Sequence, residues 1–151
     1  LTMEKHNASL KISIICVKVF TLAMIVIALF APKIFSRLIE VRIAYLGGKL
    51  HCFLRSTYIL CLPRAVVLAG LYKLLTNIQI GDVFTDENTC ILGRISICCF
   101  VAAAICLASR LYYLPFLILF FAAGFVGLIL QVVKNVFRQA VAIKADNDFT
   151  I

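Results

Sequence analysis

Acidic side chains and histidines, which perform most acid–base chemistry in proteins, are scarce in this sequence. There are 7 Asp and Glu and 2 His among 151 residues, and both histidines, His6 and His51, lie outside the long apolar runs. Those runs contain no Asp or Glu, so a nucleophile paired with a base is not expected inside them. A proton- or cation-coupled pump usually needs a buried carboxylate, which is missing as well. We therefore expect no catalytic residue and a protein that is not an enzyme.

Motifs for binding phosphates, dinucleotides or metals are also missing. The chain has no Walker-type loop and no dinucleotide fingerprint, and none of its 7 cysteines forms a C-x-x-C pair. Five cysteines fall in apolar runs, where a thiol behaves as a small hydrophobe. The neighbours His51 and Cys52 have no matching pair of ligands elsewhere. We expect no cofactor, no metal site and no framework of disulfides.

Apolar residues are what the sequence has in excess. Hydrophobic residues make up 64% of the chain and charged residues 15%, and the mean hydropathy is +1.07. A soluble domain of this size has too little interior to hide so much apolar surface, so the lipid bilayer is the expected surrounding. The net charge of +8 comes from basic residues that flank the apolar runs. This placement favours anionic lipid headgroups as their partner, with no direct binding of nucleic acid.

Four apolar runs match the thickness of a bilayer, which takes about 20 helical residues to cross. They cover residues 12–30, 58–75, 92–109 and 111–133. The second run is the weakest span, because Pro63 and Arg64 lie near its start and Lys73 near its end. Only Arg110 separates the third and fourth runs, so these two helices must form an antiparallel hairpin. The predicted fold is an all-α integral membrane protein of one domain, with four transmembrane helices in an antiparallel bundle.

Two flanking segments have helical patterns of their own. Residues 33–46 carry one polar face, which predicts either an interfacial helix between the first two spans or an extension of the first span past Pro32. Residues 134–151 alternate apolar and basic faces, which predicts an amphipathic C-terminal tail that leaves the membrane and frays at its acidic end. Thr85 is a natural N-cap for the third helix.

Small residues mark where membrane helices can approach closely. Such stripes occur on three of the predicted spans, and they would serve packing inside the bundle or formation of a homo-oligomer. Their members are Ala65, Ala69 and Gly70; Cys99, Ala102, Ala103 and Cys106; and Ala123, Gly124 and Gly127.

Arg64 is the charged residue within a span that most invites a functional interpretation. It could pair with Glu40 or bind the phosphate of a lipid. The alternative is an arginine that extends its guanidinium to a nearby membrane interface.

Two short segments carry a resemblance to a known family. Residues 81–88 read G-D-V-F-T-D-E-N and precede the third span, and residues 144–151 close the chain with K-A-D-N-D-F-T-I. With the order of the spans, they resemble the bacterial four-helix membrane family called domain of unknown function 2975, the YoaS-like proteins. That family has G-x-x-F-[TS]-x-E-N before its third helix and tends to end on E-N-D-L-T-[IV]. This sequence departs from the ending with Asp146 and Phe149.

The resemblance implies no biochemical activity but suggests a regulatory setting. Members of the family are often encoded beside a small helix-turn-helix regulator, which implies a cytoplasmic transcriptional regulator as partner, a location in the bacterial plasma membrane, and cytoplasmic N- and C-termini. Both motifs fall on one predicted side of the membrane. The candidate partner-binding residues are therefore Asp82, Phe84, Thr85, Glu87, Asn88, Asp146, Asn147 and Asp148.

Three functions remain open at this point. The first is a regulatory or sensory membrane component that acts with the cytoplasmic regulator. The second is an accessory or immunity-type subunit of a larger membrane complex. The third is a carrier of lipids or small molecules, lined by Arg64 and the cysteines of the third span.

Overall fold

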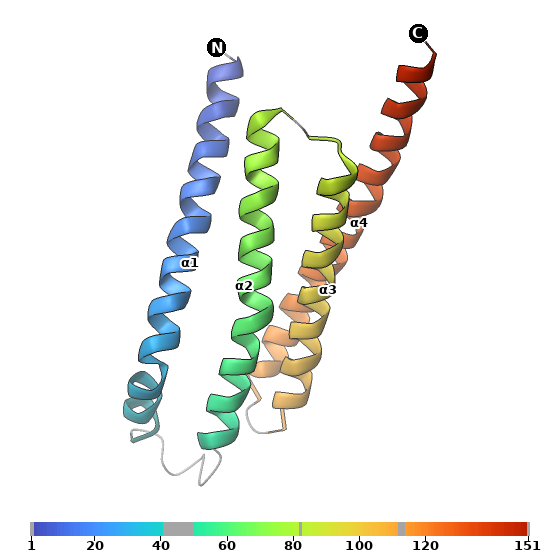
Figure 1. Ribbon diagram of the computed structural model, residues 1–151. Helices are drawn as coiled ribbons and strands as arrows, with labels where there is room; N and C mark the ends of the chain where they lie inside the picture. Colours follow the sequence, from blue (N-terminus) through green and yellow to red (C-terminus); the bar gives the residue numbers. More distant parts are fainter. Residues whose placement is uncertain (1, 41–49, 82, 112–113, 151) are drawn as a thin grey trace.

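Four long helices form the protein in a computed structural model, which describes residues 2–40, 50–81, 83–111 and 114–150 (Figure 1). They are α1 (Thr2–Glu40), α2 (Leu50–Ile80), α3 (Asp86–Ser109) and α4 (Phe116–Phe149). Within these ranges there is no strand. Each helix holds a segment long and apolar enough to cross a membrane: Ala8–Lys33, His51–Ile80, Asp86–Ser109 and Phe116–Phe149. The prediction of an all-helical chain with four such segments is confirmed.

The helices lie side by side in the order of the sequence (Figure 1). Among the described residues, backbone contacts join α1 to α2, α2 to α3, and α3 to α4, and no other pair. The start of α1, the α2–α3 connection and the end of α4 lie at one end of the molecule (Figure 1), which is called the terminal end below. Because α1 contacts α2 alone, its outer face is left for lipid or for another protein.

Two of the helices continue past their predicted ends. The helix of the first span runs through Pro32 to Glu40, so residues 33–40 extend the first span, and residues 41–46 of the predicted interfacial helix lie outside the described part. The predicted fraying of the tail is wrong, because α4 stays helical to Phe149. Its end is closed by Thr150, whose N–H donates to the Asn147 carbonyl at 3.3 Å and whose hydroxyl donates to the Asp146 carbonyl at 2.6 Å.

The third helix begins where its cap predicts. Thr85 has extended backbone angles, and its hydroxyl accepts a hydrogen bond from the Asn88 N–H at 3.3 Å. Asp86 and Glu87 follow in the first turn, where carboxylates interact favourably with the positive end of the helix dipole.

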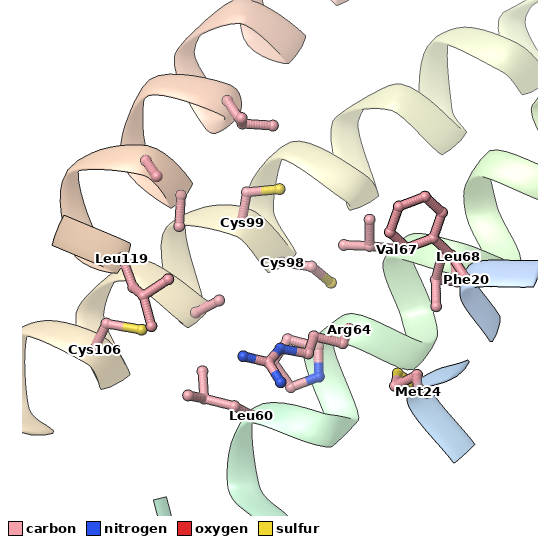
Figure 2. Close-up of a pocket in the computed structure, with 15 residues that line it drawn as sticks. Phe20, Met24, Leu60, Arg64, Val67, Leu68, Cys98, Cys99, Cys106 and Leu119 are labelled. Atoms are coloured by element: carbon pink, nitrogen blue, oxygen red, sulfur yellow. The ribbon is translucent and has the colours of Figure 1, made fainter. Parts of the chain in front are cut away.

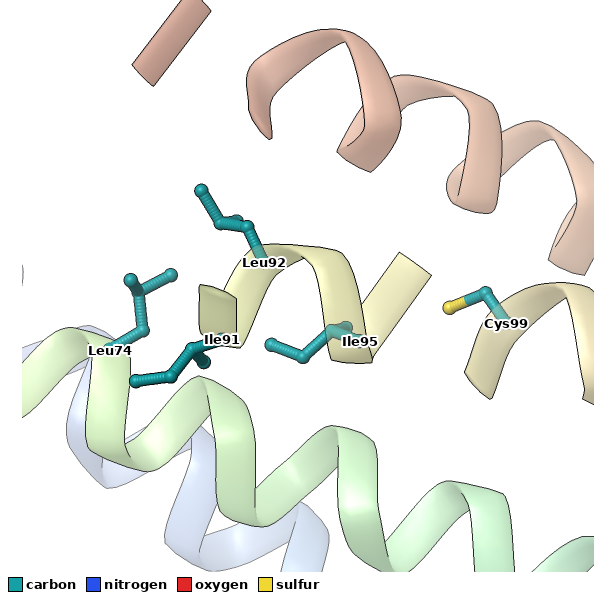
Figure 3. Packing of buried hydrophobic residues seen from close by; sticks show 5 residues of the cluster. All are labelled: Leu74, Ile91, Leu92, Ile95 and Cys99. Atoms are coloured by element: carbon teal, nitrogen blue, oxygen red, sulfur yellow. The ribbon is translucent and has the colours of Figure 1, made fainter. Parts of the chain in front are cut away.

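The core of the molecule surrounds α3. Leu74 of α2 packs against Ile91, Leu92 and Ile95 of α3 (Figure 3), and side chains of α4 cover the same cluster. Two serine side chains of α3 form hydrogen bonds to the neighbouring helices, one to α4 and one to α2. The buried Ser96 hydroxyl lies 2.9 Å from the Gly127 carbonyl oxygen, to which it donates, and the Ser109 hydroxyl lies 3.0 Å from that of Ser56.

The small-residue stripes take different positions in the structure. Cys99, Ala103, Cys106 and Gly127 are buried, as expected for contact faces within the molecule. Gly70 faces Ile95 so closely that an added Cβ would lie 2.8 Å from its Cγ1. By contrast, a Cβ on Gly124 would meet nothing within 4 Å. Packing between consecutive helices therefore uses some of these small residues and leaves others on outer faces.

Candidate functional site

A cavity of about 440 Å³ lies between the helices near the middle of the molecule. All four helices contribute to its wall, and among the described residues that line it only Arg64 is charged. Figure 2 shows the Arg64 side chain extending from α2 into the space between Leu60, Cys98 and Leu119. The labelled wall residues in that view are Phe20, Met24, Leu60, Arg64, Val67, Leu68, Cys98, Cys99, Cys106 and Leu119.

The position of Arg64 along its helix differs from the one that the predicted span implied. The second span was predicted to begin at residue 58, which would place Arg64 near an interface. Instead α2 begins at Leu50, eight residues earlier, and Arg64 lies midway between Arg55 and Lys73, nine residues from each. Nine helical residues rise about 13 Å, close to half the thickness of the hydrocarbon layer. Arg64 therefore lies near the middle of α2, about 13 Å along the helix from each of these two basic residues, and it is an exposed residue.

The charge of Arg64 is left without a protein partner in the described part of the chain. Its guanidinium forms no ion pair and no hydrogen bond there. A central charge on a membrane helix costs about 2.5–3.5 kcal/mol on insertion scales, and charges in this position usually mark a functional site. Three thiols, of Cys98, Cys99 and Cys106, lie across the cavity from it, and thiols are weak hydrogen-bonding groups. The cavity thus combines an apolar wall with one cation that could bind an anion.

A second, wider groove separates α1 from α2. Its volume is about 670 Å³, and Lys18 lines it with its Nζ 5.7 Å from the centre of the Tyr72 ring, a distance at which the cation is attracted by the ring face. Met24 and Leu68 line both this groove and the Arg64 cavity. The two spaces therefore adjoin, and α1 is the most loosely packed wall of both.

Side chains of the predicted partner-binding loop, residues 82–88, form hydrogen bonds within the chain. Asn88 is completely buried, and its amide donates to the Val83 carbonyl at 2.9 Å while its carbonyl accepts from the Asn77 amide at 2.8 Å. Thr85 caps α3. Gly81 has a φ of +103°, a left-handed conformation that favours glycine. The motif that carries the family resemblance is thus explained by the turn from α2 into α3.

Other predicted residues in this region also have intramolecular partners. The ring of Phe84 lies 5.4 Å from that of Phe137 on α4, and Glu87 forms an ion pair with Lys73 at 2.6 Å. Both charged groups are more than half exposed, so this pair contributes at most about 1 kcal/mol. Asp82 lies outside the described residues. These partners could not be predicted from the sequence, because they lie on other helices.

The remaining predicted residues are far from the cavity. Asp146, Asn147 and Asp148 are exposed on the last turns of α4. Glu40 is the last residue of α1, and nothing is described of its side chain. Arg64 lies fourteen residues beyond the first residue of α2, which is about 21 Å of helix rise. The structure therefore gives no support to an ion pair between Glu40 and Arg64.

The described part of the chain contains no cluster of metal ligands and no disulfide bond. No group of three or more His, Cys, Asp or Glu side chains converges there, and all seven cysteines are unpaired. The expectations of no cofactor and no enzymatic activity remain predictions.

Comparison with known proteins adds one positive result. No curated protein matches the chain, and no solved structure does. A protein family does match, from residue 2 to residue 151. Because this match covers essentially the whole sequence, the chain belongs to the family described as protein of unknown function (DUF2975).

Proposed function

We propose that this protein is a non-enzymatic membrane component that binds an amphipathic molecule in the Arg64 cavity. The observation that carries the proposal is a guanidinium without a protein partner among the described residues, lining an apolar cavity near the middle of α2. A volume of about 440 Å³ is in the range that holds small molecules. The preferred ligand would have an apolar body and one anionic group, such as a fatty acid or another lipophilic carboxylate.

Replacing Arg64 by Gln tests this proposal directly. In neutral-lipid nanodiscs, we expect Arg64→Gln to weaken binding of a fluorescent fatty acid at least tenfold, because the charge-assisted contact is lost. Ala123→Phe should also reduce binding, since the larger side chain would fill part of the cavity. Arg55→Gln is the matched control, because Arg55 is exposed on the same helix and does not line the cavity. Equal affinities in all four proteins would refute the proposal.

For the protein in its membrane, we propose an antiparallel four-helix bundle in the bacterial plasma membrane with both termini in the cytoplasm. The shared position of the two ends in Figure 1 supports a common side for the termini. Residues 33–40, which continue α1, would reach the opposite interface. The uncovered face of α1 is where we place a contact between copies, if the protein forms a homo-oligomer.

We also propose a regulatory role, in which the terminal end binds a cytoplasmic helix-turn-helix regulator. Support comes from the exposed carboxylates of Asp86, Asp146 and Asp148, all at that end. Phe84, Thr85, Glu87 and Asn88 are less suited to the role than the sequence indicated, because each has a partner within the chain. The binding surface is therefore narrowed to the tail and the first turn of α3.

Two native cysteines allow the orientation to be tested. Cys52 and Cys90 are both exposed, and they lie near the starts of α2 and α3, at opposite ends of the molecule. In intact cells, we expect a membrane-impermeant maleimide to label Cys52 and to spare Cys90 until the membrane is opened. The reverse pattern would place the termini outside the cell and refute the proposal that the regulator-binding surface faces the cytoplasm.

Co-purification tests the partner itself. We expect a variant with Asp146→Asn and Asp148→Asn to retain at most one fifth of the regulator that the wild-type protein retains. Asn135→Ala, an exposed change on the same helix, should have no effect. If the regulator never co-purifies and an integral membrane protein is crosslinked instead, the regulatory role fails and an accessory or immunity-type subunit is the better description.

A further inference from the structure

Three basic side chains converge on a separate cavity between α3 and α4. This cavity, of about 360 Å³, is lined by Arg94 from α3 and by Lys134 and Arg138 from α4. Arg94 precedes Lys134 by forty positions in the sequence, so the meeting of Arg94 with the two basic residues of α4 depends on how the two helices pack. The cavity lies toward the terminal end of α3 and α4, away from the Arg64 cavity.

The charges of this cluster are not balanced by the protein. One carboxylate, that of Asp86, lines the same cavity. Arg94, Lys134 and Arg138 form no ion pair within the described ranges. Three cations and one carboxylate leave a local charge of about +2. Like charges held together on a surface repel one another, and a bound anion would relieve that repulsion.

The depth of the cluster corresponds to the membrane interface. On α4, no charged residue lies between Phe116 and Lys134, and on α3 none lies between Arg94 and the C-terminal Ser109. Arg94 and Lys134 therefore end the apolar stretches of two packed helices on the same side. Apolar surface continues below them, where Ile97 lines the same cavity and is 61% exposed.

A glycine allows the basic side chains to share this site. The Lys134 side chain lies across α3 at Gly93, where an added Cβ would be 3.2 Å from Cε and 3.3 Å from Nζ. Any larger residue at position 93 would push the ammonium group outward. The ammonium group of Lys134 therefore lies against α3 at Gly93, and Arg94 is the residue that follows Gly93 in the sequence.

We propose that Arg94, Lys134 and Arg138 bind the phosphate headgroup of an anionic phospholipid, with an acyl chain lying along Ile97. The two arginines can offer paired N–H donors to phosphate oxygens, and the lysine adds a point charge. The exposed apolar surface directly below favours a lipid over free phosphate. This site lies apart from the Arg64 cavity, and although it shares Asp86 with the proposed regulator-binding surface, it does not rest on that proposal.

Nanodiscs of defined composition test the site. We expect the purified protein to retain spin-labelled phosphatidylglycerol more tightly than phosphatidylcholine. Arg94→Gln and Lys134→Gln should each weaken that preference about fivefold, the effect of one basic residue near a membrane surface. Asp86→Asn should strengthen it, because a repulsive carboxylate is removed. Lys144→Gln is the matched control, since Lys144 is exposed on α4 beyond the cavity. A preference that is unchanged in both cavity variants would overturn the proposal.

The wild-type protein offers a second readout that does not depend on how the variants fold. Cys90 lines the cavity and is exposed. We expect phosphatidylglycerol to slow its modification by N-ethylmaleimide at least threefold relative to phosphatidylcholine. Cys52 lies at the opposite end and reports any general effect of the charged bilayer. Its rate of modification should be similar in phosphatidylglycerol and in phosphatidylcholine. Equal slowing of both cysteines would overturn the proposal, and so would protection of Cys90 by millimolar inorganic phosphate in neutral nanodiscs, which would assign the site to free phosphate.

Discussion

Replacing Gly70 by Val is expected to destabilise the protein more than any other single change in its membrane-spanning part. Even the first carbon of a new side chain would lie 2.8 Å from Cγ1 and 2.9 Å from Cδ1 of Ile95. Ile95 is 1% exposed, so the protein encloses its side chain. Overpacking of this kind costs about 1–3 kcal/mol, and the two γ-methyl groups of valine put the effect at the upper end. Thermal unfolding in mild detergent should show a clear drop in the midpoint.

The chain provides both a control and a rescue for this experiment. Gly124→Val introduces the same side chain on α4, where nothing lies within 4 Å of an added Cβ, so its midpoint should stay close to that of the wild-type protein. Ile95→Ala combined with Gly70→Val should cost less than the sum of the two single changes, because the smaller residue makes room. If Gly124→Val is as damaging as Gly70→Val, the close approach of α2 and α3 at Gly70 is not the cause.

Asn88→Ala is the second change with a large expected effect. It would leave the Asn77 amide without its acceptor and the Val83 carbonyl without its donor, at a site where Asn88 itself is fully buried. Leaving buried polar groups unpaired costs about 1–3 kcal/mol. We expect a loss of about 2 kcal/mol in the free energy of unfolding and faster proteolysis at the α2–α3 connection. Asn135→Ala, at an exposed position on α4, should be neutral.

A double-mutant cycle separates the hydrogen bond from a general disturbance of the loop. With Asn77 already changed to Ala, the further change of Asn88 to Ala should cost about 1 kcal/mol less than it does alone, because no amide is left unpaired. Strict additivity of the two changes would contradict a direct role for the Asn77–Asn88 bond.

These expectations change how the family motif is interpreted. Gly81, Phe84, Thr85 and Asn88 each have a structural role in the turn, as a left-handed glycine, a ring contact, a helix cap and a buried hydrogen-bonding group. The segment that carries the family resemblance therefore has a structural explanation that needs no binding partner. Tests of partner binding should use Asp86 and the tail, because changes in the turn would alter stability as well.

The sequence by itself determined the four apolar helices, the cap at Thr85 and the lack of ionisable carboxylates in the spans. Hydropathy and capping are local properties, read over one or two helical turns, and they need no knowledge of neighbouring helices. Only the tertiary structure decided the place of Arg64 in a cavity between the helices, the partners of Asn88 and the meeting of Arg94 with Lys134 and Arg138. These depend on where each helix begins and on which face it turns to its neighbour. In lipid, close contacts such as Gly70 with Ile95 settle that choice, because burial of apolar surface favours no particular face.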